Sequence, residues 1–249
     1  MSTKTDVLIV KGLSKSYGGR QVVKAIDLAV REGEVFGILG PNGAGKTTTL
    51  EMIEALRPID AGTAAIDGVD VGSQPRRVKA MIGVQTQSTT FHDRVRLVEH
   101  LEFFASIFGR QIDPLAILRS VQLEAQAKSF FEQLSGGQKQ RFSIAIALVH
   151  DPKVLFLDEP TASLDPQARR NLWELVEQLS KQGLTIVLTT HYMEEAERLC
   201  DRLAIMDDGR IIALDTPAAL IAAYKKKTGD TKVDLEDVFL DLTGKALRD

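Results

Sequence analysis

The feature that most constrains this chain is a glycine-rich segment, residues 40–47, which directly follows the apolar run at residues 35–39. Its sequence, GPNGAGKT, fits the pattern G-x-x-x-x-G-K-[ST]. Glycines in such a loop let successive backbone N–H groups turn inward around phosphate oxygens, where a Cβ would block the approach. The pattern therefore predicts a buried strand, a phosphate-binding loop and then a helix at residues 47–56, whose positive dipole end faces the anion.

Each residue type in this loop has a role in holding a nucleotide. Lys46 brings a positive charge to the β- and γ-phosphates, which makes it a candidate catalytic residue, and the Thr47 hydroxyl is a candidate ligand for Mg²⁺. The residues predicted to contact the phosphates are Gly40, Pro41, Asn42, Gly43, Ala44, Gly45, Lys46, Thr47 and Thr48.

Composition narrows the class of protein. Hydrophobic residues make up 44% and charged residues 26% of the 249, which is typical of a globular chain. The net charge of −3 provides no chain-wide basic field, so we expect no nucleic-acid partner. The single cysteine, Cys200, excludes an internal disulfide framework and favours a reducing compartment. The longest purely apolar runs are far shorter than the roughly 20 residues that span a bilayer, so any membrane role would come through a partner.

The order of segments predicts an α/β fold. Residues 7–13 and 22–30 predict strands, and residues 62–71 predict a hairpin. Apolar side chains at helical spacing predict a helical insertion at residues 95–131, with Phe103 and Phe104 in its core, and a further helix follows at residues 137–150. Strands and helices then alternate up to residue 206, which predicts parallel strands joined by crossover helices.

An acidic pair follows a second buried strand. Residues 154–157 are apolar, and Asp158 and Glu159 come directly after them. Because a buried parallel strand delivers its carboxyl end to the ligand crevice, these carboxylates are predicted beside the phosphate loop. Asp158 is a candidate Mg²⁺ ligand, and Glu159 is a candidate catalytic base that polarises the attacking water.

A second glycine-rich turn, LSGGQ at residues 134–138, precedes the helix at residues 137–150. One nucleotide does not need two such anion-binding turns in one domain. With this turn the sequence resembles the ATP-binding cassette (ABC) ATPase family, whose signature motif it matches without substitution. The resemblance extends over residues 7 to about 220.

The remaining landmarks of that family occur in order. The resemblance implies that Tyr17 stacks on adenine, that Gln87 binds nucleotide and Mg²⁺, and that His191 contacts the γ-phosphate as a catalytic residue. Gln85 competes for the role of Gln87, and the family spacing favours Gln87. The residues implied to complete a nucleotide site are Ser135, Gly136, Gly137, Gln138 and Asp165.

The resemblance also implies a fold and a mechanism. The fold is that of an α/β P-loop NTPase with a RecA-like core, an N-terminal antiparallel β subdomain and a helical insertion subdomain at about residues 90–150. The ATPase domain would take residues 1–220, and residues 221–249 would form a short C-terminal helical extension. ATP and Mg²⁺ would bind between two copies paired head to tail. A separate integral-membrane permease would hold this homodimer at the cytoplasmic, inner face of the membrane.

The type of cassette is less tightly constrained by the sequence. Segments at residues 99–105 and 235–244 resemble the bacterial branch that exports drugs, ions and polysaccharides. Subunits of small-solute importers remain an alternative. A non-transport cassette fits less well, because only about ninety residues separate Lys46 from Ser135 and leave no room for a long coiled coil.

Overall fold

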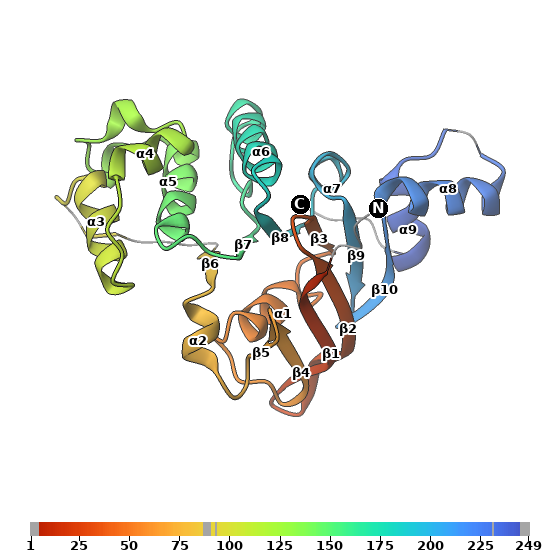
Figure 1. Cartoon of the computed structure of the whole chain (residues 1–249). Helices are drawn as coiled ribbons and strands as arrows, with labels where there is room; N and C mark the ends of the chain where they lie inside the picture. The colour runs from red at the N-terminus through yellow and green to blue at the C-terminus, as the bar shows by residue number, and fades with distance from the viewer. Residues whose placement is uncertain (1–4, 87–90, 93, 231, 245–249) are drawn as a thin grey trace.

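The computed structural model describes residues 5–86, 91–92, 94–230 and 232–244. Within these residues the strands form two sheets, and the helices lie against them (Figure 1). A four-stranded sheet has the order β2-β1-β4-β5. Its strands are β1 (Asp6–Tyr17), β2 (Arg20–Arg31), β4 (Ala61–Ile66) and β5 (Val69–Asp70). All of its pairings are antiparallel, as the sequence predicts for the N-terminal strands.

The second sheet has six strands in the order β10-β9-β3-β8-β7-β6. These strands are β3 (Val35–Leu39), β6 (Ile82–Gln85), β7 (Val154–Asp158), β8 (Thr185–Thr190), β9 (Arg202–Asp207) and β10 (Arg210–Asp215). The five strands from β9 to β6 run parallel, and β10 is antiparallel to β9. The predicted alternation of parallel strands and helices is therefore confirmed.

The central strands are buried on both faces, which explains their continuous apolar sequences. Every residue of β3, β7 and β8 is buried. Alternate side chains enter different cores. Leu155 and Leu157 face a core formed with the larger helices, whereas Val154 and Phe156 face a core shared with the antiparallel sheet and α1 (Lys46–Ile53). The mixed sheet is thus the middle layer of the molecule.

The helices fall into groups along the chain. Figure 1 shows α3, α4 and α5 gathered on one side of the mixed sheet, and α8 and α9 at the opposite end. The remaining helices are α2 (Pro75–Lys79), α3 (Leu97–Ile107), α4 (Pro114–Ser120), α5 (Gly136–Leu148), α6 (Pro166–Lys181), α7 (Met193–Leu199), α8 (Pro217–Thr228) and α9 (Leu235–Thr243), with short 3₁₀ turns at Glu124–Gln126 and Phe131–Gln133. No helix within the described ranges is both long and apolar enough to cross a membrane.

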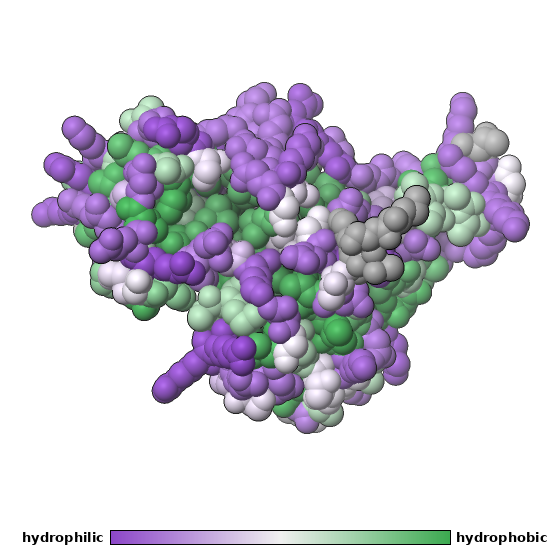
Figure 2. Space-filling model, in the orientation of Figure 1, coloured by the Kyte–Doolittle hydropathy of each residue, from purple (hydrophilic) through white to green (hydrophobic). Residues whose placement is uncertain are grey.

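The prediction for the two phenylalanines of α3 is only half right. Phe104 packs against the helical core, but 55% of Phe103 is exposed. Ile107, one turn further along, is 61% exposed. Phe103 lies beyond the face of α3 that packs on the core, so only Phe104 contacts that core. Figure 2 shows hydrophobic surface over this helical group, set among polar side chains.

The close packing of β6 against the end of α5 depends on a glycine. A Cβ at Gly83 would lie 2.3 Å from the carbonyl oxygen of Ala147 and 3.1 Å from Cγ of Pro152. We expect Gly83→Ala to lower the free energy of unfolding by about 1–3 kcal/mol, the usual cost of overpacking a core. Gly72→Ala is the control, because its Cβ would meet only Asp70 Oδ1, at 3.5 Å. Urea unfolding of both variants measures the difference, and equal midpoints would contradict the prediction.

Candidate active site

The phosphate loop connects β3 to α1 at the carboxyl edge of the mixed sheet. Gly43 and Gly45 have φ angles of 81° and 104°, values that favour glycine. A Cβ at Gly40 would lie 2.3 Å from the carbonyl oxygen of Met206, so only glycine fits at that position. The space above the loop is a cavity of about 340 Å³, lined by Val22, Asn42, Gly43, Gly45, Lys46, Thr47, Thr48 and Glu159.

Lys46 is folded back into its own loop. Its ammonium group donates hydrogen bonds to the carbonyl oxygens of Gly40, at 2.8 Å, and Pro41, at 3.2 Å. It also forms an ion pair with Glu159 Oε1 at 3.1 Å. The lysine side chain is only 4% exposed and that of Glu159 10%. Because a buried charge needs a partner, the base predicted from β7 neutralises the lysine in this state.

Asp158, at the end of β7, is held by hydroxyl groups from two other elements. Thr47 Oγ1 lies 3.2 and 3.1 Å from its two carboxylate oxygens, and Thr189 Oγ1 on β8 donates to Oδ1 at 2.5 Å. Burial raises the pKa of Asp158, and these hydroxyl groups oppose the rise. The predicted proximity of Asp158 and the phosphate loop is therefore present in the structure.

Glu159 follows Asp158 in a strained conformation, with a φ angle of +46°. Its backbone N–H donates to Thr189 Oγ1 at 3.0 Å. Its second carboxylate oxygen lies 3.4 Å from Nδ1 of His191, which follows β8. The structure thus brings together Lys46, Glu159 and His191, the three predicted catalytic residues.

A Mg²⁺ ion fits the oxygens present here. The Thr47 hydroxyl and the Asp158 carboxylate are hard oxygen donors that already lie within hydrogen-bond distance of each other. Mg²⁺ in nucleotide sites typically takes one or two such protein ligands and completes its shell with phosphate oxygens and water. Within the described residues no three His, Cys, Asp or Glu side chains are grouped to hold a metal ion, so the phosphates would supply ligands. Gln87, the third predicted ligand, lies outside the described residues.

Two buried polar residues neighbour this site: Glu54, which belongs to no sequence motif, and Gln85, the alternative to Gln87 in the sequence analysis. Glu54 on α1 is 3% exposed, and burial, followed by the charges of Asp158 and Glu51, raises its pKa to about 8. Gln85, at the end of β6, is 2% exposed and donates to the carbonyl oxygen of Thr86. Both line a cavity of about 190 Å³ beside Asp158. An acidic residue at the end of a helix ordinarily indicates a solvated position, so the sequence carried no signal for the burial of Glu54.

Tyr17 lies at the end of β1 and is 41% exposed. Lys15 Nζ and Arg57 Cζ each lie 5.6 Å from the centre of its ring. Tyr17 is not one of the residues that line the cavity over the phosphate loop. The predicted aromatic surface is accessible, and its contact with adenine stays a prediction.

The second glycine-rich turn begins α5. Ser135 caps the helix by accepting from the N–H of Gln138 at 3.3 Å, and the Gln138 side chain accepts from the N–H of Ser135 at 2.9 Å. A Cβ at Gly137 would lie 2.9 Å from Cβ of Ala168, so the turn packs closely on α6. Gly136 is exposed beside Leu164. Asp165 caps α6 by accepting from the N–H groups of residues 167 and 168.

The signature turn and the phosphate loop do not meet within one chain. Figure 1 shows α5 grouped with α3 and α4, away from α1. None of the described residues that line the cavity over the phosphate loop comes from residues 134–138. The structure therefore brings the loop, the acidic pair and the histidine together, and it leaves the second anion-binding turn separate.

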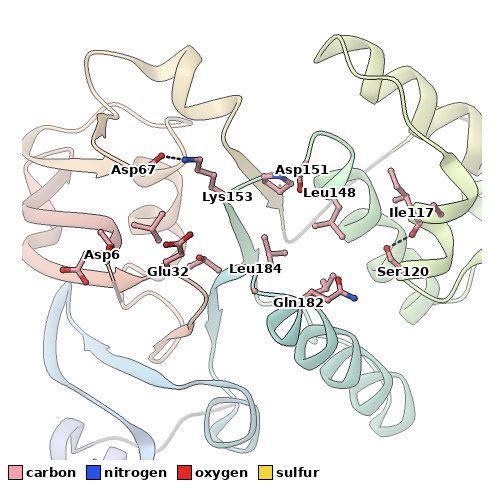
Figure 3. A pocket seen from close by; sticks show the side chains of 17 residues that line it. Asp6, Glu32, Asp67, Ile117, Ser120, Leu148, Asp151, Lys153, Gln182 and Leu184 are labelled. Atoms are coloured by element: carbon pink, nitrogen blue, oxygen red, sulfur yellow. Dashed lines mark hydrogen bonds and ion pairs between the residues drawn. The ribbon is translucent and has the colours of Figure 1, made fainter. Parts of the chain in front are cut away.

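A larger cavity, of about 570 Å³, lies at the opposite edge of the sheet (Figure 3). It opens between the first residues of β8, the end of α6 and Ile117 on α4. Its charged lining includes Glu32 and the ion pair between Lys153 and Asp67. The predicted catalytic residues do not line it, so this cavity is separate from the candidate site.

The family model described as "ABC transporter" matches residues 23–162 of this chain. A linearmycin resistance ATP-binding protein from Bacillus subtilis is 38% identical, over 92% of this chain and 74% of its own length. A Nod factor export ATP-binding protein from Ralstonia nicotianae is 43% identical, over 87% of this chain and 69% of its own length.

A solved structure has the same fold. It is an ATP-binding cassette determined as a dimer in a post-hydrolysis state with ADP and phosphate. The match has a TM-score of 0.76 at 27% identity and covers 84% of this chain and 98% of that one. Together with the phosphate loop, the acidic pair and the signature turn, these similarities place the chain in the ABC transporter family, as an ATP-binding subunit with ATPase activity.

Proposed function

We propose that this chain is the ATP-hydrolysing subunit of an exporter, and that it works as a head-to-tail dimer with a separate membrane permease. The observation that carries the proposal is the division of the site. Lys46, Glu159 and His191 meet at the phosphate loop, whereas the signature turn of the same chain lies apart from them. A second copy placed head to tail would bring its Ser135–Gly137 turn over that loop and complete the site.

The chemistry of the proposed site follows from the contacts of Glu159. In the structure this carboxylate is paired with Lys46. The γ-phosphate of ATP attracts the same lysine, so nucleotide binding would release Glu159 to orient and deprotonate the attacking water. His191, close to the other oxygen of Glu159, would contact the γ-phosphate. Mg²⁺ at Thr47 and Asp158 would neutralise developing charge on the phosphates.

The direction of transport and the permease rest on different observations. Both relatives described above carry names that refer to resistance or export. The exposed Phe103 and Ile107 of α3 supply an apolar surface on the helical group, suited to contact with the cytoplasmic face of a permease. The chain would then work at the inner face of the membrane without entering it.

The first prediction tests the site assignment. Lys46→Ala should weaken ATP binding, because it removes the charge that faces the phosphates. Asp158→Asn should leave ATP binding in place and lower Mg²⁺-dependent turnover at least tenfold, because an amide is a poor ligand for a hard cation. Isothermal titration and a phosphate-release assay measure the two quantities. Unchanged turnover in both variants would refute the assignment.

The second prediction concerns adenine. If Tyr17 stacks on the base, Tyr17→Ala should weaken ATP affinity by about 0.5–1.5 kcal/mol, and Tyr17→Phe should bind as the unaltered chain does. The same titration calorimetry provides both affinities. Equal losses in the two variants would assign the effect to the hydroxyl group and contradict stacking.

The third prediction tests the divided site. Glu159→Gln keeps the shape of the side chain and removes both the base and a negative charge near the γ-phosphate. We expect this variant to dimerise with ATP in light scattering, and to stay monomeric with ADP or without nucleotide. Adding Ser135→Arg should abolish the dimer while ATP binding by the monomer persists. Loss of monomer binding in the double variant would contradict the head-to-tail arrangement.

A further inference from the structure

Glu195 on α7 is a buried carboxylate that belongs to none of the motifs described above. The residue is fully buried. Its Oε1 atom accepts two hydrogen bonds, from the Thr161 hydroxyl at 2.9 Å and from the Trp173 indole N–H at 2.9 Å. Burial raises the pKa of Glu195, and contacts with the hydroxyl of Thr190, with Trp173 and with Thr161 oppose that rise. A buried carboxylate is costly, so its partners indicate what it holds in place.

Thr161 connects Glu195 to the turn that carries the proposed base. This turn, residues 159–164, is stabilised by hydrogen bonds from Ala162 N to the Glu159 carbonyl at 3.1 Å and from Leu164 N to the Thr161 carbonyl at 3.2 Å. Both Glu159 and Ser163 have positive φ angles, 46° and 64°. A turn with two residues in this conformation needs support from outside, and the bond from Thr161 to Glu195 provides it.

Thr190 ends β8 and opens the turn that leads into α7, the helix of Glu195, on the other side of the site. Its hydroxyl accepts from the N–H of Tyr192 at 2.9 Å, which shapes the turn around His191. Its carbonyl accepts from the N–H of Gly40 at 3.3 Å, at the start of the phosphate loop. Because Glu195 lies in the first turn of α7, its position is tied to the histidine turn that leads into this helix, and through Thr190 to the phosphate loop.

A second contact connects the start of α6 to the turn around His191. The guanidinium carbon of Arg169, in the first turns of α6, lies 4.1 Å from the centre of the Tyr192 ring. Arg169 Nε and Glu195 Oε2 are both buried, and neither has a hydrogen-bond partner among the residues that the structure describes. The attraction between these two groups favours the charged form of Glu195. The region between α6 and α7 thus holds a buried cation and a buried carboxylate.

We propose that Glu195 is a positioning residue that makes the turn at residues 159–164, with Asp165 directly after it, move as one unit with the turn carrying His191. The inference rests on the catalytic roles proposed for Glu159 and His191. In a head-to-tail dimer Asp165 would face the partner subunit, so the hydrogen bonds of Glu195 would link the arrangement at that interface to the base and the histidine of its own site.

The test compares variants at one position. Glu195→Leu keeps a similar volume and removes the acceptor for Thr161 and Trp173. Glu195→Gln retains one carbonyl oxygen that can accept both bonds. We expect Leu to lower kcat for ATP at least tenfold with KM within twofold, and Gln to restore most of the rate. Glu194→Gln, at an exposed neighbour on the same helix, is the matched control and should retain the full rate.

A second variant distinguishes loss of the hydrogen bond from loss of folding. Thr161→Val removes the hydroxyl and leaves Glu195 and its helix in place. It should lower kcat as Glu195→Leu does, and the double variant should be no slower than either single one, because both break the same link. Melting temperatures measured on all variants separate lost rate from lost structure. Rates within twofold of the unaltered chain for both single variants would overturn the proposal, and so would independent, multiplying effects.

Trp173 gives a spectroscopic readout because it is the sole tryptophan in the sequence and donates to Glu195. In Glu159→Gln, ATP should shift the tryptophan emission. Adding Glu195→Leu should remove that shift while binding of a fluorescent ATP analogue persists. A shift that survives the second substitution would overturn the link. If Glu159→Gln alone retained full turnover, the proposed function would fail first, which distinguishes the two failures.

Discussion

The hydroxyl group of Thr189 is the interaction on which the arrangement of the site depends. It donates to the Asp158 carboxylate at 2.5 Å and accepts from the backbone N–H of Glu159 at 3.0 Å. One side chain at the end of β8 therefore fixes both acidic residues at the end of β7. The parallel register places Asp158 directly opposite Thr189, and a shift of one residue would turn the hydroxyl to the other face of the sheet. The packing of the sheet core thus determines the position of the acidic pair.

The charge of Lys46 is neutralised within the site itself. Lys46 is 4% exposed, and its ammonium group is surrounded by two carbonyl oxygens and the Glu159 carboxylate. A buried ammonium group without a counter-charge would be strongly destabilising, so the base also serves as the partner of the lysine. A phosphate that replaces this carboxylate supplies the same negative charge. Under the proposed role of Glu159, nucleotide binding and activation of the base would be consequences of one exchange of partners.

Much of the fold could be predicted because local sequence and burial agree. The continuous apolar runs before Gly40 and Asp158 indicate strands buried on both faces, and the structure confirms them. The helices that begin at Pro166 and Pro217 each have a polar N-cap residue and a proline in the first turn, which is expected at a helix N-terminus. Strand β6 has only four residues and no alternating pattern, so its apolar content alone does not identify it.

The sequence predicts the site residues that belong to short motifs, but not those whose position depends on long-range contacts. The phosphate loop and the acidic pair each occupy a short stretch whose spacing has chemical meaning. The roles of Glu54, Thr189 and Glu195 depend on contacts with residues far away in the chain. Glu195 lies within the sequence MEEAER, which favours a solvated helix, yet tertiary packing buries it completely against Trp173. Only the folded structure reveals that one of the three glutamates in MEEAER, Glu195, faces inward.

The position of β3 between β8 and β9 also sets the order in which the site can form. Val35 pairs with Ile186 and Phe36 with Arg202, so the strand before the phosphate loop finds its neighbours about 150 residues later in the chain. Such pairings are slow to form and cannot begin until the later strands exist. At a synthesis rate of roughly 5–20 residues per second, the loop leaves the ribosome about 7–30 s before β8. During that interval the nascent chain carries the complete phosphate-loop sequence without the histidine turn, and it has no assembled machinery with which to consume ATP.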